Sequence, residues 1–86
     1  MDIRLHRNFE RRYVKIPPNI RKQFKERRDI FLENPFDPVL HNHALQGKYH
    51  GYRSINITGN YRAVYKLIAQ DVVIFTDLGT HSEMYS

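Results

Sequence analysis

The sequence predicts one α+β domain, residues 1–86, in which two helices pack on one face of an antiparallel sheet. Three observations support this fold class. A short segment of alternating apolar and polar residues opens the chain, helix-like spacing of apolar residues follows, and strand-like segments separated by turn residues fill the second half. Because helices and strands fall in separate runs, an α+β arrangement is favoured over an alternating parallel sheet. The other sheet face is then partly open, and a polar groove there is the expected site.

The first two predicted elements are short. Residues 2–6 alternate apolar and polar side chains, which predicts a half-buried strand. Asn8 is a suitable N-cap for a helix that begins at Phe9. This helix must end before Pro17, because proline interrupts the hydrogen bonds of a helix interior.

A second, longer helix is predicted from Pro18, which suits a first helical turn, to about Asn34, where Pro35 stops it. Its apolar residues share one stripe, so the two helices should form a hairpin with an apolar inner face and a basic outer face. The basic residues of the outer face are Arg21, Lys22, Lys25, Arg27 and Arg28.

A loop is predicted over residues 35–51, where prolines and glycines recur, with Leu40 and Leu45 anchoring it to the core. Three antiparallel strands are predicted to follow, over residues 52–57, 61–68 and 72–77. The last of them is apolar on both faces, so we expect it inside the sheet.

A tight turn, Thr58-Gly59-Asn60, should join the first two of these strands, with Gly59 or Asn60 in a positive-φ conformation. Gly79 ends the third strand. The remaining residues are predicted to form a short tail that returns His81 towards the turn.

The composition restricts the kinds of site that the chain can hold. There is no cysteine, which excludes disulfides, iron–sulfur clusters and cysteine-based zinc sites and fits a reducing cytoplasm. The first residues lack the apolar segment of a signal peptide, and no apolar run approaches the roughly 20 residues of a membrane span. We therefore expect a cytoplasmic protein without membrane contact.

The charge is positive and unevenly distributed. The formal net charge is +5, and ten of the fourteen Lys and Arg residues lie in residues 1–28 beside three acidic residues. Such a basic segment suits a polyanion or an acidic protein partner, and it equally suits a solvated helix face.

Most catalytic motifs are missing from the sequence. His41 and His43 alternate in the loop, but no carboxylate pattern completes a metal site around them, so no metal is expected. No serine lies in a nucleophile-elbow pattern. No glycine-rich phosphate loop or dinucleotide fingerprint precedes a helix, and no cofactor is expected.

The remaining polar residues suit RNA cleavage, which needs a base for the 2′-hydroxyl, an acid for the leaving 5′-oxygen and a cation for the phosphorane. Histidine serves as acid or base near neutrality, arginine binds phosphate, and tyrosine stacks on unstacked bases. Aromatic residues in strands are more often core residues, which we expect for Tyr65 and Phe75. The residues that the hairpin and the tail can bring together are His43, Arg53, Tyr61, Arg62, His81 and Tyr85.

The second half of the chain carries, in order, the motifs His43-Ala44-Leu45-Gln46-Gly47, Gly51-Tyr52-Arg53, Asn60-Tyr61-Arg62, Val64-Tyr65-Lys66 and Gly79-Thr80-His81, with Tyr85 after them. In this combination they resemble the RelE/ParE toxin superfamily, and its YafQ-type branch in particular. Each motif alone is weak. Together they are fairly specific, and the resemblance covers nearly the whole chain, including the order of its elements.

This resemblance implies a toxin of a type II toxin–antitoxin system that enters the ribosomal A site and cleaves mRNA without a metal, leaving a cyclic phosphate. It also implies a cognate antitoxin that silences the toxin, with operator DNA bound only through the antitoxin. We expect an acidic amphipathic helix of the antitoxin to contact the basic helix at Arg21, Lys25 and Arg28.

Position in the motifs also implies roles for single residues. His81 is the candidate general acid, and His43 is a candidate base or phosphate contact. Tyr85 takes the place of an aromatic residue that stacks on a base, and Tyr61 stands where some relatives carry tryptophan. Further RNA contacts are expected from Arg53 and Lys48.

Three positions depart from the YafQ-type pattern. Asn56 replaces a second histidine, Asn60 replaces an aspartate and Asp77 replaces an arginine. Asparagine does not exchange protons near pH 7, but it can position a phosphate or a hydroxyl, so Asn56 and Asn60 remain candidate catalytic-site residues. We expect Asp77 to pair with Arg53 or Arg62, and one of these arginines to supply the cation of the site.

Two other functions fit the same resemblance. A ParE-like protein would inhibit DNA gyrase without ribonuclease chemistry, and the retained histidines argue against it. An inactive toxin relic would only bind its antitoxin, and the three departures favour it. The ribonuclease remains the interpretation that uses the most residues of the motif.

Overall fold

The computed structural model describes residues 1–85, with side chains for residues 1–84. The strands are β1 (Asp2–Leu5), β2 (His43–Ala44), β3 (Arg53–Asn56), β4 (Tyr61–Ala69) and β5 (Val72–Thr80). The helices are α1 (Arg7–Tyr13), α2 (Pro18–Glu33) and α3 (His81–Tyr85), with short 3₁₀ turns η1 (Pro38–Leu40) and η2 (Gly47–Tyr49). Within the described residues, no helix is long and apolar enough to cross a membrane.

The strands form one sheet in the order β1-β5-β4-β3-β2. β1 runs parallel to β5, and the other neighbours are antiparallel. The α+β class is confirmed, and β5 lies inside the sheet as its apolar character on both faces predicts. The sheet has one strand more than predicted, because residues 43–44 in the expected loop pair with β3.

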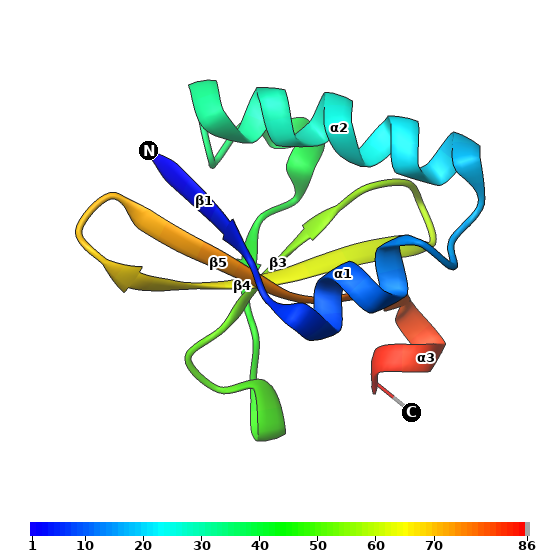
Figure 1. The fold of residues 1–86 in the computed structure, drawn as a ribbon. Helices are drawn as coiled ribbons and strands as arrows, with labels where there is room; N and C mark the ends of the chain where they lie inside the picture. Colours follow the sequence, from blue (N-terminus) through cyan, green and yellow to red (C-terminus); the bar gives the residue numbers. More distant parts are fainter. Residues whose placement is uncertain (86) are drawn as a thin grey trace.

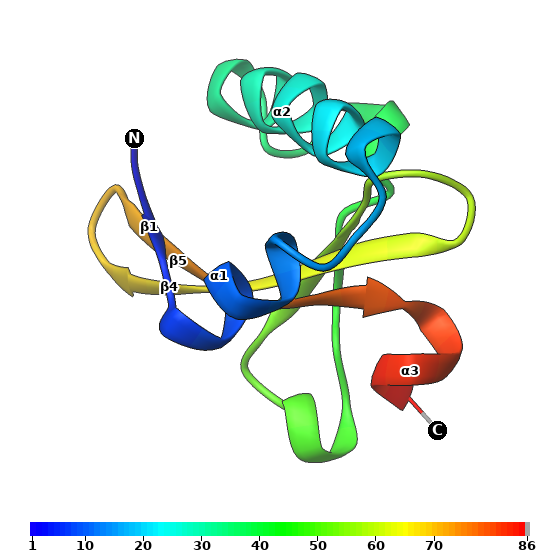
Figure 2. The ribbon, with the colours of Figure 1, turned by 45° about the vertical axis from the view of Figure 1, so that its right-hand side comes forward.

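The sheet separates two layers (Figures 1 and 2). α1 and α2 lie on one side, whereas α3 and η2 lie on the other. The main core fills the space between helices α1 and α2 and the sheet. Its centre is a group of aromatic rings whose neighbouring centroids lie 5.0–5.8 Å apart. These rings are Phe9, Phe24, Phe31, Tyr65 and Phe75. The prediction that Tyr65 and Phe75 belong to the core is confirmed, and so is the anchoring of the loop by Leu40 and Leu45.

A second, smaller core lies on the opposite face. It consists of Leu45, Val64 and Met84, with Tyr49 and Tyr52 packed against it. The C-terminal residues were predicted as a tail, but they form α3, because Met84 is buried in this cluster. The open face of the sheet is therefore divided in two by a ridge of apolar side chains.

The start of the first helix differs from the prediction. α1 begins at Arg7, and its N-cap is His6, whose Nδ1 accepts a hydrogen bond from the backbone N–H of Asn8 at 3.0 Å. The Asn8 side chain instead donates to the Thr76 carbonyl at 3.1 Å. Asn8 therefore joins α1 to β5, a tertiary bond that competes with capping.

The turn between β3 and β4 also differs. Neither Gly59 nor Asn60 has a positive φ. The Thr58 hydroxyl oxygen accepts from the backbone N–H groups of Asn60 at 3.2 Å and Tyr61 at 3.1 Å. The turn is thus fixed by a side-chain acceptor and needs no left-handed residue.

Candidate active site

Three of the five histidines meet at one cavity of about 530 Å³ on the α3 side of the sheet. The cavity lies against the turn end of β3 and β4. We call it the histidine pocket, and its lining residues are His41, His43, Leu45, Gln46, Asn56, Arg62 and His81. Four of the predicted site residues, His43, His81, Arg62 and Asn56, are therefore brought together.

Strand pairing explains this meeting. Asn56 on β3 lies opposite Arg62 on β4, and both alternate with residues of the main core, so both face the histidine pocket. His43 on β2 pairs with Ser54, two residues before Asn56 on the same face of β3. His81 is the first residue of α3, directly after β5, and its backbone N–H donates to the Asn60 carbonyl at 3.1 Å.

The tautomer of His43 follows from its contact with the chain. His43 Nδ1 lies 2.8 Å from the His41 carbonyl oxygen. Because a carbonyl oxygen only accepts, Nδ1 carries the hydrogen, and Nε2 of the neutral ring keeps its lone pair. His41 holds this carbonyl in place with a left-handed backbone at φ 47°. His43 therefore presents the nitrogen of a base in an exposed position.

Arg62 is held by the turn beside it. Its Nη1 donates to the carbonyls of Thr58 at 3.1 Å and Gly59 at 3.0 Å. No carboxylate in the described part of the chain forms an ion pair with Arg62. The histidine pocket therefore contains a fixed positive charge that backbone dipoles orient and no carboxylate neutralises.

Two buried polar atoms of β3 have no hydrogen-bond partner within the described residues, and one of them belongs to Asn56, which lines the histidine pocket. Asn56 Oδ1 and Ser54 Oγ are buried and form no hydrogen bond within the described residues. Buried acceptors of this kind are rare in folded proteins and mark places where a polar ligand or water is accommodated. Sequence analysis did not point to Ser54, and it named His41 only when a metal site was considered.

His81 is positioned by a capping box at the start of α3. The Thr80 backbone N–H donates to Glu83 Oε1 at 2.8 Å, and the Glu83 backbone N–H donates to the Thr80 hydroxyl at 3.2 Å. These bonds from Thr80, with the charge of Arg12 as a smaller cause, hold the pKa of Glu83 below its ordinary value of 4.5. The two bonds fix the first turn of α3 and with it the backbone of His81.

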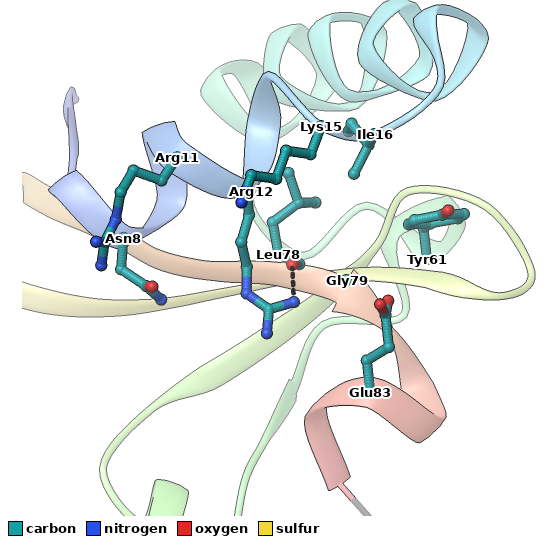
Figure 3. Close-up of a pocket in the computed structure, with 9 residues that line it drawn as sticks. All are labelled: Asn8, Arg11, Arg12, Lys15, Ile16, Tyr61, Leu78, Gly79 and Glu83. Carbon is teal, nitrogen blue, oxygen red and sulfur yellow. Dashed lines mark hydrogen bonds between the residues drawn. The ribbon is translucent and has the colours of Figure 1, made fainter.

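Tyr61 lies outside the histidine pocket. It lines a neighbouring cavity of about 440 Å³ between α1 and α3, together with Arg11, Arg12 and Glu83 (Figure 3). Arg12 extends from α1 across β5 and donates through Nη1 to the Leu78 carbonyl at 3.1 Å. The Asn60 side chain also does not line the histidine pocket.

The sequence predicted that Asp77 pairs with Arg53 or Arg62, and this prediction is wrong. Its Oδ1 lies 3.2 Å from Arg12 Nε, and its Oδ2 accepts from the Tyr49 hydroxyl at 3.0 Å. Arg12 reaches Asp77 because β1 ends at Leu5 and leaves this stretch of β5 accessible to α1. The carboxylate therefore joins α1, β5 and η2 outside the histidine pocket.

Arg53 also lies away from the histidine pocket. It shares the helix-facing side of β3 with Ile55, stacks on Phe36 with 5.3 Å between guanidinium and ring centroid, and donates Nε–H to Asn42 Oδ1 at 2.8 Å. Successive side chains of a strand face opposite sides of the sheet, so Arg53 cannot face the histidine pocket when Asn56 does. Lys48 lies on η2 and lines a third cavity. The side chain of Tyr85 lies outside the described residues.

A family model described as a bacterial toxin of the type II toxin–antitoxin system, YafQ, matches residues 1–86. The chain belongs to the YafQ toxin family. A comparison with curated proteins finds no match.

Solved structures share the fold of this YafQ-family chain. YafQ from E. coli strain BL21(DE3) is 23% identical with a TM-score of 0.79, and the alignment covers 99% of this chain and 98% of that chain. The E. coli DinJ–YafQ complex gives 23% identity, a TM-score of 0.76 and the same coverage. The RelE–RelB complex of Pyrococcus horikoshii OT3 gives 20% identity, a TM-score of 0.72 and 92% coverage of each chain.

Some basic side chains of α2 in this YafQ-family chain already form contacts within the chain, which its composition does not reveal. Arg21 Nη1 donates to the Ile16 carbonyl at 2.8 Å, which ties α2 to the end of α1. Arg28 lies 3.4 Å from the carboxylate of Asp29. Lys25 is exposed, and no ion pair with it is formed among the described residues.

The histidine pocket does not contain a preformed metal centre. Within the described residues, no group of three or more His, Asp or Glu side chains is arranged to hold a metal ion. The chemistry available in this pocket is proton transfer by histidine and charge stabilisation by arginine.

Proposed function

We propose that this YafQ-family toxin is an endoribonuclease that cleaves mRNA in the ribosomal A site, and that the histidine pocket is its active site. The observation that carries the proposal is the convergence of His43, His81 and Arg62 on one cavity. Two groups that can take or give a proton and one permanent cation are the minimum set for RNA cleavage without a metal. A toxin directed to the ribosome acts in the cytoplasm.

The geometry supports a division of roles between the two histidines. His43 Nε2 takes the proton of the 2′-hydroxyl, whose oxygen attacks the adjacent phosphorus. His81, in its imidazolium form, gives a proton to the 5′-oxygen as the bond between phosphorus and that oxygen breaks. One proton is taken and one is given, and the products are a 2′,3′-cyclic phosphate and a 5′-hydroxyl.

Arg62 and Asn56 complete the proposed site. Arg62 places its charge beside the non-bridging phosphate oxygens, where negative charge grows in the transition state. Because Asn56 Oδ1 is buried, its amide N–H groups are the atoms that can contact phosphate. Neither side chain transfers a proton in this scheme.

Growth arrest and primer extension test the proposal. Induced parent protein is expected to arrest growth and to produce cuts within translated codons, whereas His43→Ala and His81→Ala produce neither. His50→Ala is the matched control, because His50 is exposed and lines none of the three cavities described above. Full cleavage by the His81→Ala variant would contradict the assigned acid.

The alternative of an inactive relic has one specific observation in its favour. Asn56 contributes an amide to the histidine pocket at the position where the YafQ-type pattern has a histidine. If only Asn56→His or Asn60→Asp arrests growth, the natural chain has lost activity and retains antitoxin binding. Cleavage by the parent protein excludes this alternative.

We also propose an antitoxin as the protein partner. The support is that E. coli YafQ and archaeal RelE were each solved with a partner, DinJ and RelB respectively. The exposed charge of Lys25 and the half-buried Arg28 on α2 suit an acidic helix. Lys25→Glu is expected to weaken antitoxin binding, Lys48→Glu on η2 is the matched charge control, and equal affinities would contradict the assigned face.

A further inference from the structure

A second cavity on the same sheet face has no assigned role. It measures about 570 Å³ and lies on the other side of the Leu45–Val64–Met84 ridge from the histidine pocket. We call it the tyrosine pocket, and the lining residues used below are Lys48, Tyr49, Tyr52, Lys66, Ile74 and Asp77.

The aromatic rings of the tyrosine pocket are fixed by their neighbours. Tyr49 and Tyr52 meet edge to face with centroids 6.1 Å apart, and both are half-buried against the ridge. The Tyr49 hydroxyl is held by Asp77 at 3.0 Å. Rings held in this way keep their orientation when a ligand binds, so little side-chain freedom is lost.

The tyrosine pocket is positively charged. Lys48 Nζ lies 5.4 Å from the Tyr49 ring centroid, and Lys66 Nζ lies 5.1 Å from that of Tyr52. The nearest carboxylate, Asp77, is already compensated by Arg12 at 3.2 Å. Lysine side chains beside fixed aromatic rings are a combination that binds single-stranded nucleic acid, with bases on the rings and phosphates on the lysines.

The two pockets are linked by one strand. Side chains at positions 62, 64 and 66 of β4 face the same side, so β4 presents Arg62 to the histidine pocket and Lys66 to the tyrosine pocket. Four residues of strand span about 13 Å, at about 3.3 Å per residue. At the roughly 3.4 Å spacing of a stacked strand, this corresponds to about four nucleotides or fewer.

We propose that the tyrosine pocket binds a nucleotide that flanks the cleavage point on the same RNA strand, stacking its base on Tyr52 and contacting its phosphate through Lys66. This inference rests on the proposed ribonuclease function. An acidic peptide is the less suitable occupant, because a more apolar cavity lies elsewhere among the described residues, lined by Phe31, Phe36, Leu67 and Val73. Only a polyanion with flat rings uses both features of the tyrosine pocket.

The test is a titration of ¹⁵N-labelled protein with a fully 2′-O-methylated hexanucleotide, which has no 2′-hydroxyl to attack. Amide shifts are followed at about 1 mM oligonucleotide, where complexes with millimolar Kd are visible. We expect shifts at Tyr52, Lys66 and Ile74 as well as at Arg62. Shifts confined to the histidine pocket, or no shifts at all, overturn the inference whatever a cleavage assay gives.

Variants separate the tyrosine pocket from the catalytic machinery. Tyr52→Leu should weaken binding about fivefold or more, because one stacked base is lost. Lys66→Gln should lower the salt slope of log K by about 0.7, the value for one phosphate contact on a single strand. Lys22→Gln, exposed on α2 behind the sheet, is the matched control.

The two proposals fail in different ways. Because Tyr52 packs on the small core, Lys66→Gln on the half-exposed strand surface provides a variant that keeps the fold. If Lys66→Gln and Tyr52→Leu bind like Lys22→Gln while the parent cleaves mRNA, the inference fails and the ribonuclease stands. If both variants weaken binding while the parent cleaves nothing, the tyrosine pocket stands and the ribonuclease fails.

Discussion

Met84→Ala tests whether the small core holds the two histidines in place. Leu45 follows the short strand that carries His43, and Met84 lies in the helix that begins with His81. Both pack on Val64 of the central strand β4, so three side chains join both histidine-bearing segments to the sheet. Loss of the Met84 side chain should therefore affect both segments and spare the main core.

The size of the effect follows from burial. Met84 is 2% exposed, and replacing a buried methionine by alanine costs about 2–5 kcal/mol of unfolding free energy. The side chains around the small core can relax only partly into the space, so we expect a loss within this range. Cleavage by the variant should fall as well, since both histidines lose their support.

The assay is urea unfolding followed by circular dichroism, with hydrogen exchange of the α3 amides. Leu67→Ala is the matched control, because Leu67 is 65% exposed and its loss should change the unfolding free energy by only about 0.5 kcal/mol. If Met84→Ala unfolds like Leu67→Ala and cleaves RNA at the parent rate, the small core does not support the site and the reasoning is refuted.

Three further predictions concern the contacts around β5. Arg12→Met should lower the unfolding free energy by about 1–3 kcal/mol, because the Asp77 side chain is only 14% exposed and loses its ion-pair partner. Adding Asp77→Asn should recover part of this loss, which a double-mutant cycle in urea will measure. Gly79→Ala should cost about 1 kcal/mol, since its Cβ would lie 2.9 Å from Arg12 Nη1, and a neutral result would mean that Arg12 moves aside freely. The pKa of Glu83 is lowered on folding, so its carboxylate stabilises the fold above its ordinary pKa of 4.5. This contribution is lost as the pH falls through the lower pKa of the folded state. The unfolding free energy of Glu83→Gln should therefore fall less steeply at acid pH than that of the parent.

The regular elements were predictable because their signals are local. α2 lies between prolines, and β4 and β5 are long runs with turn residues at their ends, so their existence followed from spacing alone. β2 was missed because two residues are too few to show a period. α3 was missed because five residues gain their stability from Met84 and a capping box, and neither creates a visible repeat.

The site was predictable only where strand alternation and motif position agreed. His43, Asn56, Arg62 and His81 meet, as the hairpin and the returning chain suggest. The predicted partner of Asp77 was wrong, because Arg12 reaches this carboxylate past the end of β1, and sequence spacing does not reveal where β1 ends.

Arg53 and the tyrosine pocket are two further differences between the sequence-based expectation and the structure. Arg53 was grouped with the histidines although its alternation with Ile55 already placed it on the helix side. The tyrosine pocket gave no sequence signal, since Tyr49 and Tyr52 become neighbours of Lys66 only after the sheet has formed.

The most direct test of the assigned site is the end chemistry of mRNA cut on programmed ribosomes by the purified protein. We expect cleavage that leaves a 2′,3′-cyclic phosphate and a 5′-hydroxyl, that is lost in His81→Ala and that is kept in His50→Ala. Absence of cleavage by the parent, or products with a 5′-phosphate and a 3′-hydroxyl, would contradict the assignment of the histidine pocket as a metal-free ribonuclease site.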